Sequence, residues 1–137
     1  MIQPDTFQLD PRLEADTFSV TDFEVCTCRL MNDNRWPWLI LVPRKAGAEE
    51  LFDLSPSQQE AAMREASQAG EKLKSLTSCS KINIAMIGNI VRQLHIHVVA
   101  RMDGDANWPA PVWGFGQREG YSPEHARGLI AHLKGIL

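Results

Sequence analysis

Polar and apolar positions alternate with a period of two in residues 91–101 (VRQLHIHVVAR), as they do in a β-strand. One face of this strand is apolar and consists of Leu94, Ile96 and Val98. The other face carries Gln93, His95, His97 and Val99. The alternation therefore predicts a strand over residues 93–101 that aligns a carboxamide and two imidazoles on one side.

Four other segments are predicted to form strands because they are rich in β-branched, aromatic and aliphatic residues. They are residues 18–20, 23–30, 38–42 (WLILV) and 81–87 (KINIAMI). The run at 38–42 is apolar at every position, which is typical of a strand that is buried on both faces. Turn-forming residues at 32–34 (Asn-Asp-Asn) separate this run from the preceding strand.

A period near 3.6 residues predicts one long helix between the third and fourth strands. Ser55 and Pro56 fit its N-cap and first position, and Gln58 completes a capping box. The apolar face of this helix is narrow and mostly alanine, which favours close packing against a sheet. It consists of Ala62, Ala66, Ala69, Leu73 and Leu76.

Two other pairs of an N-cap residue and a proline predict further helical segments. Asp-Pro at 10–11 opens a short helical turn through residue 15, and Ser-Pro at 122–123 opens a second helix near the end of the chain. The order is strands, helix, strand hairpin and helix, with short connections between neighbouring strands. This order predicts a single α+β domain over residues 1–137, in which helices pack on an antiparallel sheet.

Composition and charge exclude several functional classes. The formal net charge is −3 and the basic residues are scattered, so nothing predicts binding to nucleic acid or to an anionic membrane surface. No run of roughly eighteen apolar residues occurs, and the N-terminal segment lacks the features of a signal peptide. The odd set Cys26, Cys28 and Cys79 indicates reduced thiols in the cytoplasm. We interpret Cys26 and Cys28 as core residues on one strand face.

Three interpretations of the polar face remain open on the residues alone. It is the solvent-exposed face of an amphipathic strand, or His95 and His97 are ligands of a metal ion. His-x-His often binds metals, although Arg101 and Met102 stand where a carboxylate would complete one such site. In the third interpretation, a neutral imidazole attacks phosphorus and divides one phosphoryl or nucleotidyl transfer into two steps. That chemistry needs an unprotonated ring nitrogen and a fixed tautomer.

The segments around this face resemble the histidine-triad (HIT) superfamily, whose motif is His-φ-His-φ-His-φ-φ with φ apolar. Residues 93–99 read Gln-Leu-His-Ile-His-Val-Val, so a glutamine replaces the first histidine. The resemblance extends to the loop, strand and proline at 32–44 (NDNRWPWLILVPR) and to the strand and turn at 82–89 (INIAMIGN). Asn-Trp-Pro at 107–109 matches a tail found in one branch. Altogether the resemblance covers about residues 18–110.

This resemblance implies a five-stranded antiparallel sheet with two helices, and a homodimer with a continuous sheet. It also implies attack on the α-phosphate of a nucleotide-containing small molecule, with no metal or other cofactor. His95 corresponds to the attacking histidine, whose other nitrogen is held by a main-chain carbonyl, and His97 contacts the phosphate and the leaving group. The implied nucleotide-binding residues are Asn32 at the ribose, Asn89 at the phosphate, Asn83 on the preceding strand, and Gln93.

Three departures from the family pattern change the surroundings of the nucleophile. Gln93 cannot carry a proton, and Trp38 stands where many members have a further histidine. With Gln93 we therefore expect a different proton relay at His95 and a different leaving-group preference. Ile90 replaces a Ser or Thr and removes a proton donor, so we expect weak activity on poor leaving groups. The sequence therefore predicts a cytoplasmic nucleotide hydrolase or nucleotidyl transferase that acts through His95, of the phosphoramidase or phosphoanhydride hydrolase type. The alternatives are a non-catalytic nucleotide-binding module and a metal-binding protein that uses His95 and His97.

Overall fold

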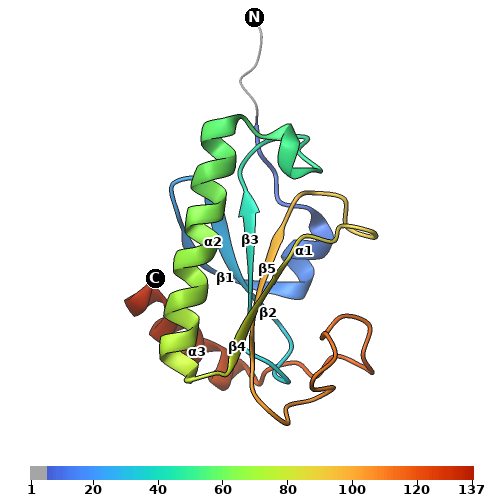
Figure 1. Ribbon diagram of the computed structural model, residues 1–137, viewed down its shortest axis with the longest axis vertical. Helices are drawn as coiled ribbons and strands as arrows, with labels where there is room; N and C mark the ends of the chain where they lie inside the picture. The colour runs from blue at the N-terminus through green and yellow to red at the C-terminus, as the bar shows by residue number, and fades with distance from the viewer. Residues whose placement is uncertain (1–5) are drawn as a thin grey trace, which may run out of the picture.

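The computed structural model describes residues 6–137, which contain a five-stranded antiparallel sheet and three α-helices (Figure 1). The strands are β1 (Thr17–Asp22), β2 (Cys26–Met31), β3 (Trp38–Pro43), β4 (Lys81–Ala85) and β5 (Ile96–Arg101), in the spatial order β1-β2-β3-β5-β4. The helices are α1 (Pro11–Asp16), α2 (Pro56–Thr77) and α3 (Pro123–Ile136), and a 3-10 turn, η1 (Leu51–Asp53), precedes α2. This architecture confirms the predicted α+β fold. The first five residues of the N-terminal segment lie outside the described residues.

The helices begin where the capping residues predict. Ser55 Oγ accepts a hydrogen bond from the main-chain N–H of Gln58, and Gln58 Oε1 accepts one from the N–H of Ser55. Asp10 caps α1 by accepting a hydrogen bond from the N–H of Arg12, and Ser122 caps α3 by accepting one from the N–H of His125. Each is followed by a proline in the first turn. Within the described part of the chain, no helix is both long and apolar enough to cross a membrane.

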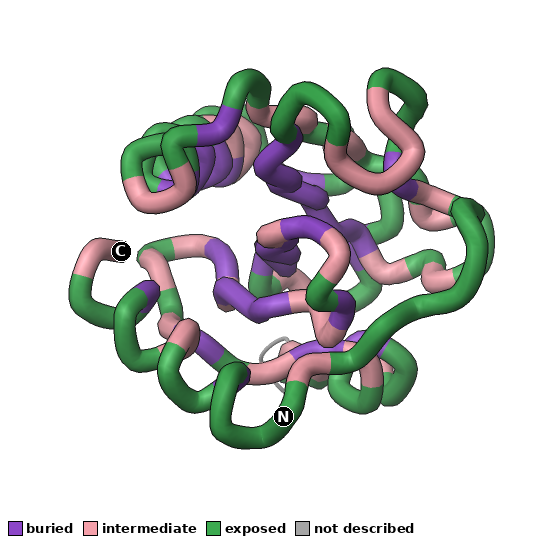
Figure 2. Tube along the Cα trace, turned by 90° about the horizontal axis from the view of Figure 1, so that it is seen from below, coloured by how far each residue is buried: buried purple, intermediate pink, exposed green. Residues whose placement is uncertain are grey.

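Apolar side chains cover both faces of the sheet. On one face α2 packs through its alanine-rich side, as the narrow apolar face predicts, and Figure 2, which looks along this helix, shows its buried residues turned inward. On the other face, α1 and the segment 106–113 cover a smaller cluster. Its main members are Leu13, Trp36, Trp38, Ile40, Val42, Val99 and Val112. The candidate catalytic histidines lie at the edge of this second cluster.

The strand that carries the histidines is shorter than predicted. β5 begins at Ile96, so the prediction that the strand begins at Gln93 is wrong. The physical reason is that pairing with β3 ends at Ile96 and pairing with β4 ends at His97, so no neighbouring strand reaches residues 93–95. Leu94 instead donates its main-chain N–H to the carbonyl of Ala48, 2.9 Å away.

Three other strand boundaries differ from the prediction by two or more residues, for a similar reason. β1 continues to Asp22, and a turn closed by a hydrogen bond from Phe23 N–H to the carbonyl of Cys26 delays the start of β2 to Cys26. β4 ends at Ala85 because its last partner on β5 is His97. In each case the pairing between strands sets the boundary, whereas the side-chain pattern continues beyond it.

The cysteines are free and buried, and Cys26 and Cys28 lie in the core on the α2 side of the sheet. Their placement confirms the core interpretation. Burial raises the pKa of the Cys28 thiol to about 12. Burial, together with the nearby carboxylate of Glu65, also raises the pKa of Cys26. Glu65 itself accepts hydrogen bonds from the N–H groups of Val25 and Cys26, which ties α2 to the first hairpin.

Candidate functional site

His95 and His97 lie side by side at the start of β5, with their ring centroids 4.8 Å apart. Both are buried, with 7 % and 5 % of their surface exposed. His97 lies two residues before Val99, whose side chain belongs to the cluster under α1, so both side chains project from the sheet face opposite α2. The end of the strand therefore brings two imidazoles together on the less covered face.

A main-chain hydrogen bond assigns the tautomer of His95. Its Nδ1 lies 2.6 Å from the carbonyl oxygen of Gln93. Because a carbonyl oxygen only accepts hydrogen bonds, Nδ1 carries the proton and Nε2 keeps its lone pair. No side chain or main-chain group within residues 6–137 forms a hydrogen bond with Nε2. The ring thus has the free nitrogen and the fixed orientation that a nucleophilic imidazole requires.

A different partner assigns the opposite tautomer to His97. Trp38 Nε1 donates a hydrogen bond to His97 Nδ1 over 3.0 Å, so the proton of the neutral His97 ring lies on Nε2. Burial lowers the pKa of His97 from 6.5 to about 3, with a smaller contribution from the charge of His95. The ring is therefore neutral at pH 7. The two histidines therefore present one lone pair and one N–H.

Two tryptophans form an apolar wall beside His97. The ring of Trp38 lies 5.6 Å from that of His97, and the ring of Trp113 lies 5.2 Å away in an edge-to-face arrangement. The two indoles also contact each other, at 6.1 Å. The indole N–H of Trp113 is buried and has no partner in the described part of the chain. Such a wall excludes water, which strengthens the hydrogen bonds and charges inside the site.

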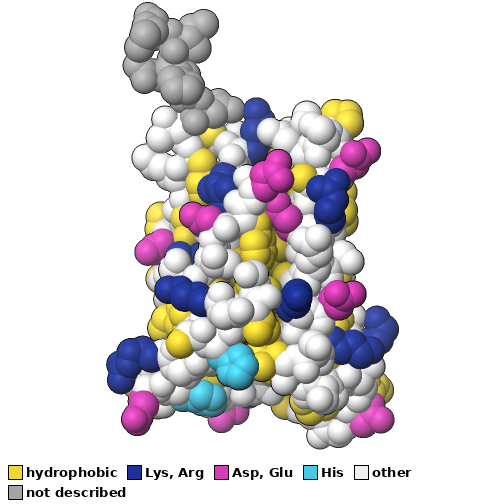
Figure 3. Space-filling view, turned by 90° about the vertical axis from the view of Figure 1, so that its left-hand side faces the viewer, with side chains coloured by type: hydrophobic (Ala, Val, Ile, Leu, Met, Phe, Trp, Pro, Cys, Tyr) yellow, Lys and Arg dark blue, Asp and Glu magenta, His cyan; other side chains and the backbone are white. Residues whose placement is uncertain are grey.

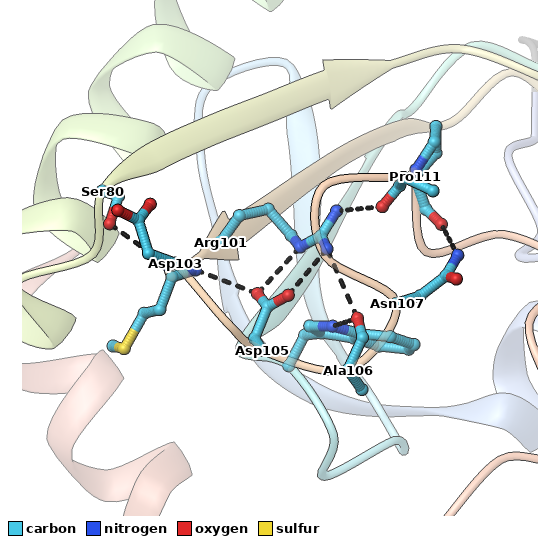
Figure 4. A network of polar contacts seen from close by, with 10 residues as sticks. Ser80, Arg101, Asp103, Asp105, Ala106, Asn107 and Pro111 are labelled. Carbon is cyan, nitrogen blue, oxygen red and sulfur yellow. Dashed lines mark hydrogen bonds and ion pairs between the residues drawn. The ribbon is translucent and has the colours of Figure 1, made fainter.

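A buried arginine holds the segment that carries Trp113. Arg101, at the end of β5, donates to both carboxylate oxygens of Asp105 and to the carbonyl oxygens of Ala106 and Ala110 (Figure 4). These contacts fold the chain after β5 back over the sheet toward the tryptophan wall. Sequence reasoning counted Arg101 among scattered basic residues, because burial of an arginine leaves no local sequence pattern.

Two of the predicted nucleotide-binding residues lie near the histidines. Asn83 pairs with Val99 across β4 and β5, which places it on the same sheet face as His97. Asn89 is exposed and follows Gly88, which adopts a positive φ of 69° that glycine accepts without strain. Gly88 and His95 line one cavity of about 170 Å³. Met86, Ile87 and Gly88, which lead into this turn, thus line the cavity beside His95.

Asn32, the residue after β2, forms a hydrogen bond with the segment that precedes α3. Its Oδ1 accepts a hydrogen bond from the main-chain N–H of Tyr121, over 2.8 Å, toward the side of α3. Its neighbours Met31 and Asp33 instead line a cavity of about 400 Å³ together with Trp38. The sequence analysis therefore missed Met31, at the end of β2, and Asp33, in the loop after it, which line this cavity with Trp38 and Trp113.

The side chain of Gln93 is bound to the main chain near the N-terminus. Its Oε1 accepts a hydrogen bond from the N–H of Asp10 at 2.8 Å, and its Nε2 donates one to the carbonyl of Gln8 at 2.9 Å. Both halves of the amide are thus engaged. The main-chain carbonyl oxygen of Gln93, in contrast, holds His95 Nδ1.

The other two histidines lie elsewhere. His125 and His132 of α3 line a groove of about 430 Å³ between α2 and α3, on the side of the molecule shown in Figure 3. In that view the histidine side chains lie beside hydrophobic ones at the lower end of the groove. Among residues 6–137, no group of three or more His, Cys, Asp or Glu side chains is placed to hold a metal ion.

Comparison with known proteins identifies the class to which this fold and site belong. The model of the HIT domain matches residues 12–104, so the chain belongs to the histidine-triad (HIT) family. A HIT protein from Sinorhizobium meliloti 1021 is 49 % identical, with 96 % of this chain and 98 % of that chain covered and a TM-score of 0.94. Histidine triad proteins from Marinobacter aquaeolei VT8 (42 % identical, 96 % of each chain covered) and Bradyrhizobium japonicum (40 %, 97 % and 98 % covered) each have a TM-score of 0.93. No functionally curated protein matches this chain.

Proposed function

We propose that this protein is a nucleotide hydrolase or nucleotidyl transferase that acts at the α-phosphate through a covalent nucleotidyl-histidine on His95. The observation that carries the proposal is the hydrogen bond between His95 Nδ1 and the carbonyl of Gln93, at 2.6 Å. It leaves the lone pair of Nε2 free for attack on phosphorus and stabilises the ring when it becomes positively charged in the intermediate.

The other residues of the site bind and orient the phosphate. His97 donates a hydrogen bond from Nε2 to a phosphate oxygen, since its Nδ1 is occupied by Trp38. Asn83 and Asn89 supply carboxamide groups from the neighbouring strand and from the turn beside His95. Gln93 shapes the site from behind, because both halves of its amide bind the main chain. Asn32, whose Oδ1 accepts a hydrogen bond from Tyr121, offers its Nδ2 to the ribose.

We also propose that the protein forms a homodimer through β4. This strand lies at the edge of the sheet, and its outer edge has no partner strand among residues 6–137. Apolar side chains at this edge and in the turn after it are exposed, namely Ile84, Met86, Ile87 and Ile90. An exposed apolar edge strand readily pairs with another chain. Ile84→Lys should therefore produce a monomer in sedimentation analysis. Lys81→Glu is the control: it exchanges one charge on the same strand for another, disrupts no apolar contact and should leave the dimer intact.

We also propose a cytoplasmic location, which the state of the cysteines supports. Cys26, Cys28 and Cys79 are free and buried, and free thiols are typical of a reducing compartment. Cell fractionation of the native protein tests this directly. Recovery from an oxidising compartment would contradict the location.

A chromatographic turnover assay in excess chelator tests the activity. The substrates are an adenosine phosphoramidate, a dinucleoside polyphosphate and an activated aryl ester of AMP. We compare the wild type with His95→Ala and with His125→Ala, a matched control because His125 is an exposed histidine of α3. Release of AMP by the wild type and the control, but not by His95→Ala, is the expected result. Trapping of a nucleotide on His95 after rapid quenching identifies the intermediate.

Each other outcome selects a different function. If no substrate is turned over while AMP still binds, the protein is a non-catalytic nucleotide-binding module. If turnover is lost only when chelator is present, His95 and His97 act through a metal ion. Equal activity of His95→Ala and wild type would place the chemistry outside this pair of histidines.

A further inference from the structure

The hydrogen bond between Trp38 and His97 has only one direction. Trp38 Nε1 lies 3.0 Å from His97 Nδ1, and both side chains are buried. An indole N–H donates hydrogen bonds, and it neither accepts them nor loses its proton near neutral pH. His97 therefore accepts at Nδ1 and keeps its own proton on Nε2.

The other neighbours of His97 also oppose a second proton on the ring. The side chains that face it are Trp38 from β3, Trp113 from the segment after β5, and His95. No carboxylate of residues 6–137 forms an ion pair with His97. A proton on Nδ1 would face the N–H of Trp38 and break their hydrogen bond.

We propose that Trp38 is a positioning residue that holds His97 as a neutral Nε2–H donor, so that the leaving group departs without taking a proton from this histidine. This inference rests on the nucleotidyl-histidine function proposed above. The substrate class that fits is a nucleotide ester or phosphoanhydride whose leaving group is stable as an anion. A nucleoside phosphoramidate does not fit, since its amine departs only after it is protonated.

The two chemical steps balance without a proton from His97. In the first step, His95 Nε2 forms a bond to phosphorus while the bond from phosphorus to the leaving oxygen breaks, and the electron pair departs with that oxygen. His97 donates a hydrogen bond to a phosphate oxygen, and the leaving group takes a proton from solvent. In the second step, water attacks phosphorus, the electron pair of the P–N bond returns to His95 Nε2, and the proton of the water passes to solvent.

Histidine at position 38 would behave differently. An imidazole facing His97 Nδ1 either donates or accepts, so a proton can pass through it to His97 and replace one given to the leaving group. Trp38 closes this route. General acid catalysis contributes about 10²–10⁴-fold to such reactions, so its absence makes the rate depend steeply on the basicity of the leaving group.

Nitrogen NMR of protein labelled at its histidines tests the tautomers without a substrate, so the result does not depend on the proposed function. We expect the proton on Nδ1 of His95 and on Nε2 of His97, with no titration of His97 between about pH 8 and about pH 5. Trp38→Phe keeps an aromatic ring but lacks the N–H, so His97 should exchange between both tautomers. Trp113→Phe is the matched control, because Trp113 contacts His97 without a hydrogen bond.

The kinetic test compares the 4-nitrophenyl, 4-chlorophenyl and phenyl esters of AMP. In the wild type, kcat/KM should fall by about 10²-fold or more from the nitrophenyl to the phenyl ester, because the phenolate departs unprotonated. Trp38→His, which restores a ring able to pass protons, should reduce this fall while the rate on the nitrophenyl ester stays within about tenfold. A merely structural role of Trp38 would instead lower the rates on all three esters by the same factor.

The outcomes separate this inference from the proposed function. Similar wild-type rates on the nitrophenyl and phenyl esters, or an Nδ1 proton on His97, would overturn the inference and leave catalysis by His95 standing. Hydrolysis of the phosphoramidate in preference to the esters would overturn the substrate class in the same way. Failure to turn over any substrate would overturn the proposed function and this inference together.

Discussion

Arg101→Met removes the centre of a buried polar network without removing the volume of the side chain. Arg101 is 1 % exposed and donates to the two carboxylate oxygens of Asp105 at 2.9 and 2.7 Å. It also donates to the carbonyl oxygens of Ala110 at 2.7 Å and Ala106 at 3.3 Å. In the variant, the Asp105 carboxylate loses its counterion, and two carbonyl groups lose a donor.

The magnitude follows from this burial. The side chain of Asp105 is only 13 % exposed, so water replaces little of what Arg101 supplies. Removing one partner of a buried ion pair costs about 3–5 kcal/mol. Since small domains unfold with a free energy of about 5–15 kcal/mol, the loss is a large fraction of the total. With an m-value of about 2 kcal/mol/M, the urea midpoint should fall by about 2 M.

Urea unfolding monitored by tryptophan fluorescence measures this loss, at one fixed protein concentration because a dimer would make stability depend on concentration. Arg64→Met is the matched control, since Arg64 of α2 is exposed and its side chain has no partner among the described residues. We expect a change within about 0.5 kcal/mol for the control. Adding Asp105→Asn to Arg101→Met should recover part of the stability, because the unpaired charge is gone. Equal losses for Arg101→Met and Arg64→Met would refute the reasoning.

Two other buried titratable side chains lead to further predictions. Burial raises the pKa of the Cys28 thiol to about 12, so a thiol-specific disulfide reagent should label it only after unfolding, and labelling at the same rate in the native protein would contradict its placement. Burial, with a smaller contribution from the charge of His95, lowers the pKa of His97 from 6.5 to about 3. Between these pH values the unfolded chain therefore binds a proton at His97 that the folded protein does not bind. The free energy of unfolding should therefore fall by up to about 1.4 kcal/mol per unit as the pH drops through this window, and less in His97→Gln.

Much of the fold was predictable because local physical chemistry determines it. The capping box of Ser55 and Gln58 involves groups within four consecutive residues, so the start of α2 needs no information from elsewhere. The apolar run at 38–42 likewise fits only a strand covered on both faces, and β3 is buried throughout. These elements agree with their tertiary surroundings, so the sequence pattern and the structure coincide.

The site was less predictable because its contacts join distant residues. The hydrogen bond from Trp38 to His97 joins residues that are 59 positions apart in the sequence. Only the register between β3 and β5 brings the two rings together. The loop after β2 illustrates how sensitive such contacts are. Met31 and Asp33 line the cavity beside Trp38, whereas the side chain of Asn32 between them accepts a hydrogen bond from the main-chain N–H of Tyr121. The sequence alone does not determine which of these three neighbours faces the cavity.

Gln93→His restores the first histidine of the motif. This variant tests whether Gln93 or Trp38 determines how strongly the rate depends on the leaving group. Gln93 binds the main chain through both halves of its amide and makes no hydrogen bond with His97, whereas Trp38 blocks His97 Nδ1 directly. Gln93→His should therefore leave the ratio of kcat/KM for the nitrophenyl and phenyl esters of AMP within about threefold of the wild type. A ratio that falls by about tenfold with Trp38 in place would mean that a proton reaches the leaving group through position 93. The sequence-based expectation that Gln93 alters the proton relay would then hold, and Trp38 would not be the residue that closes it.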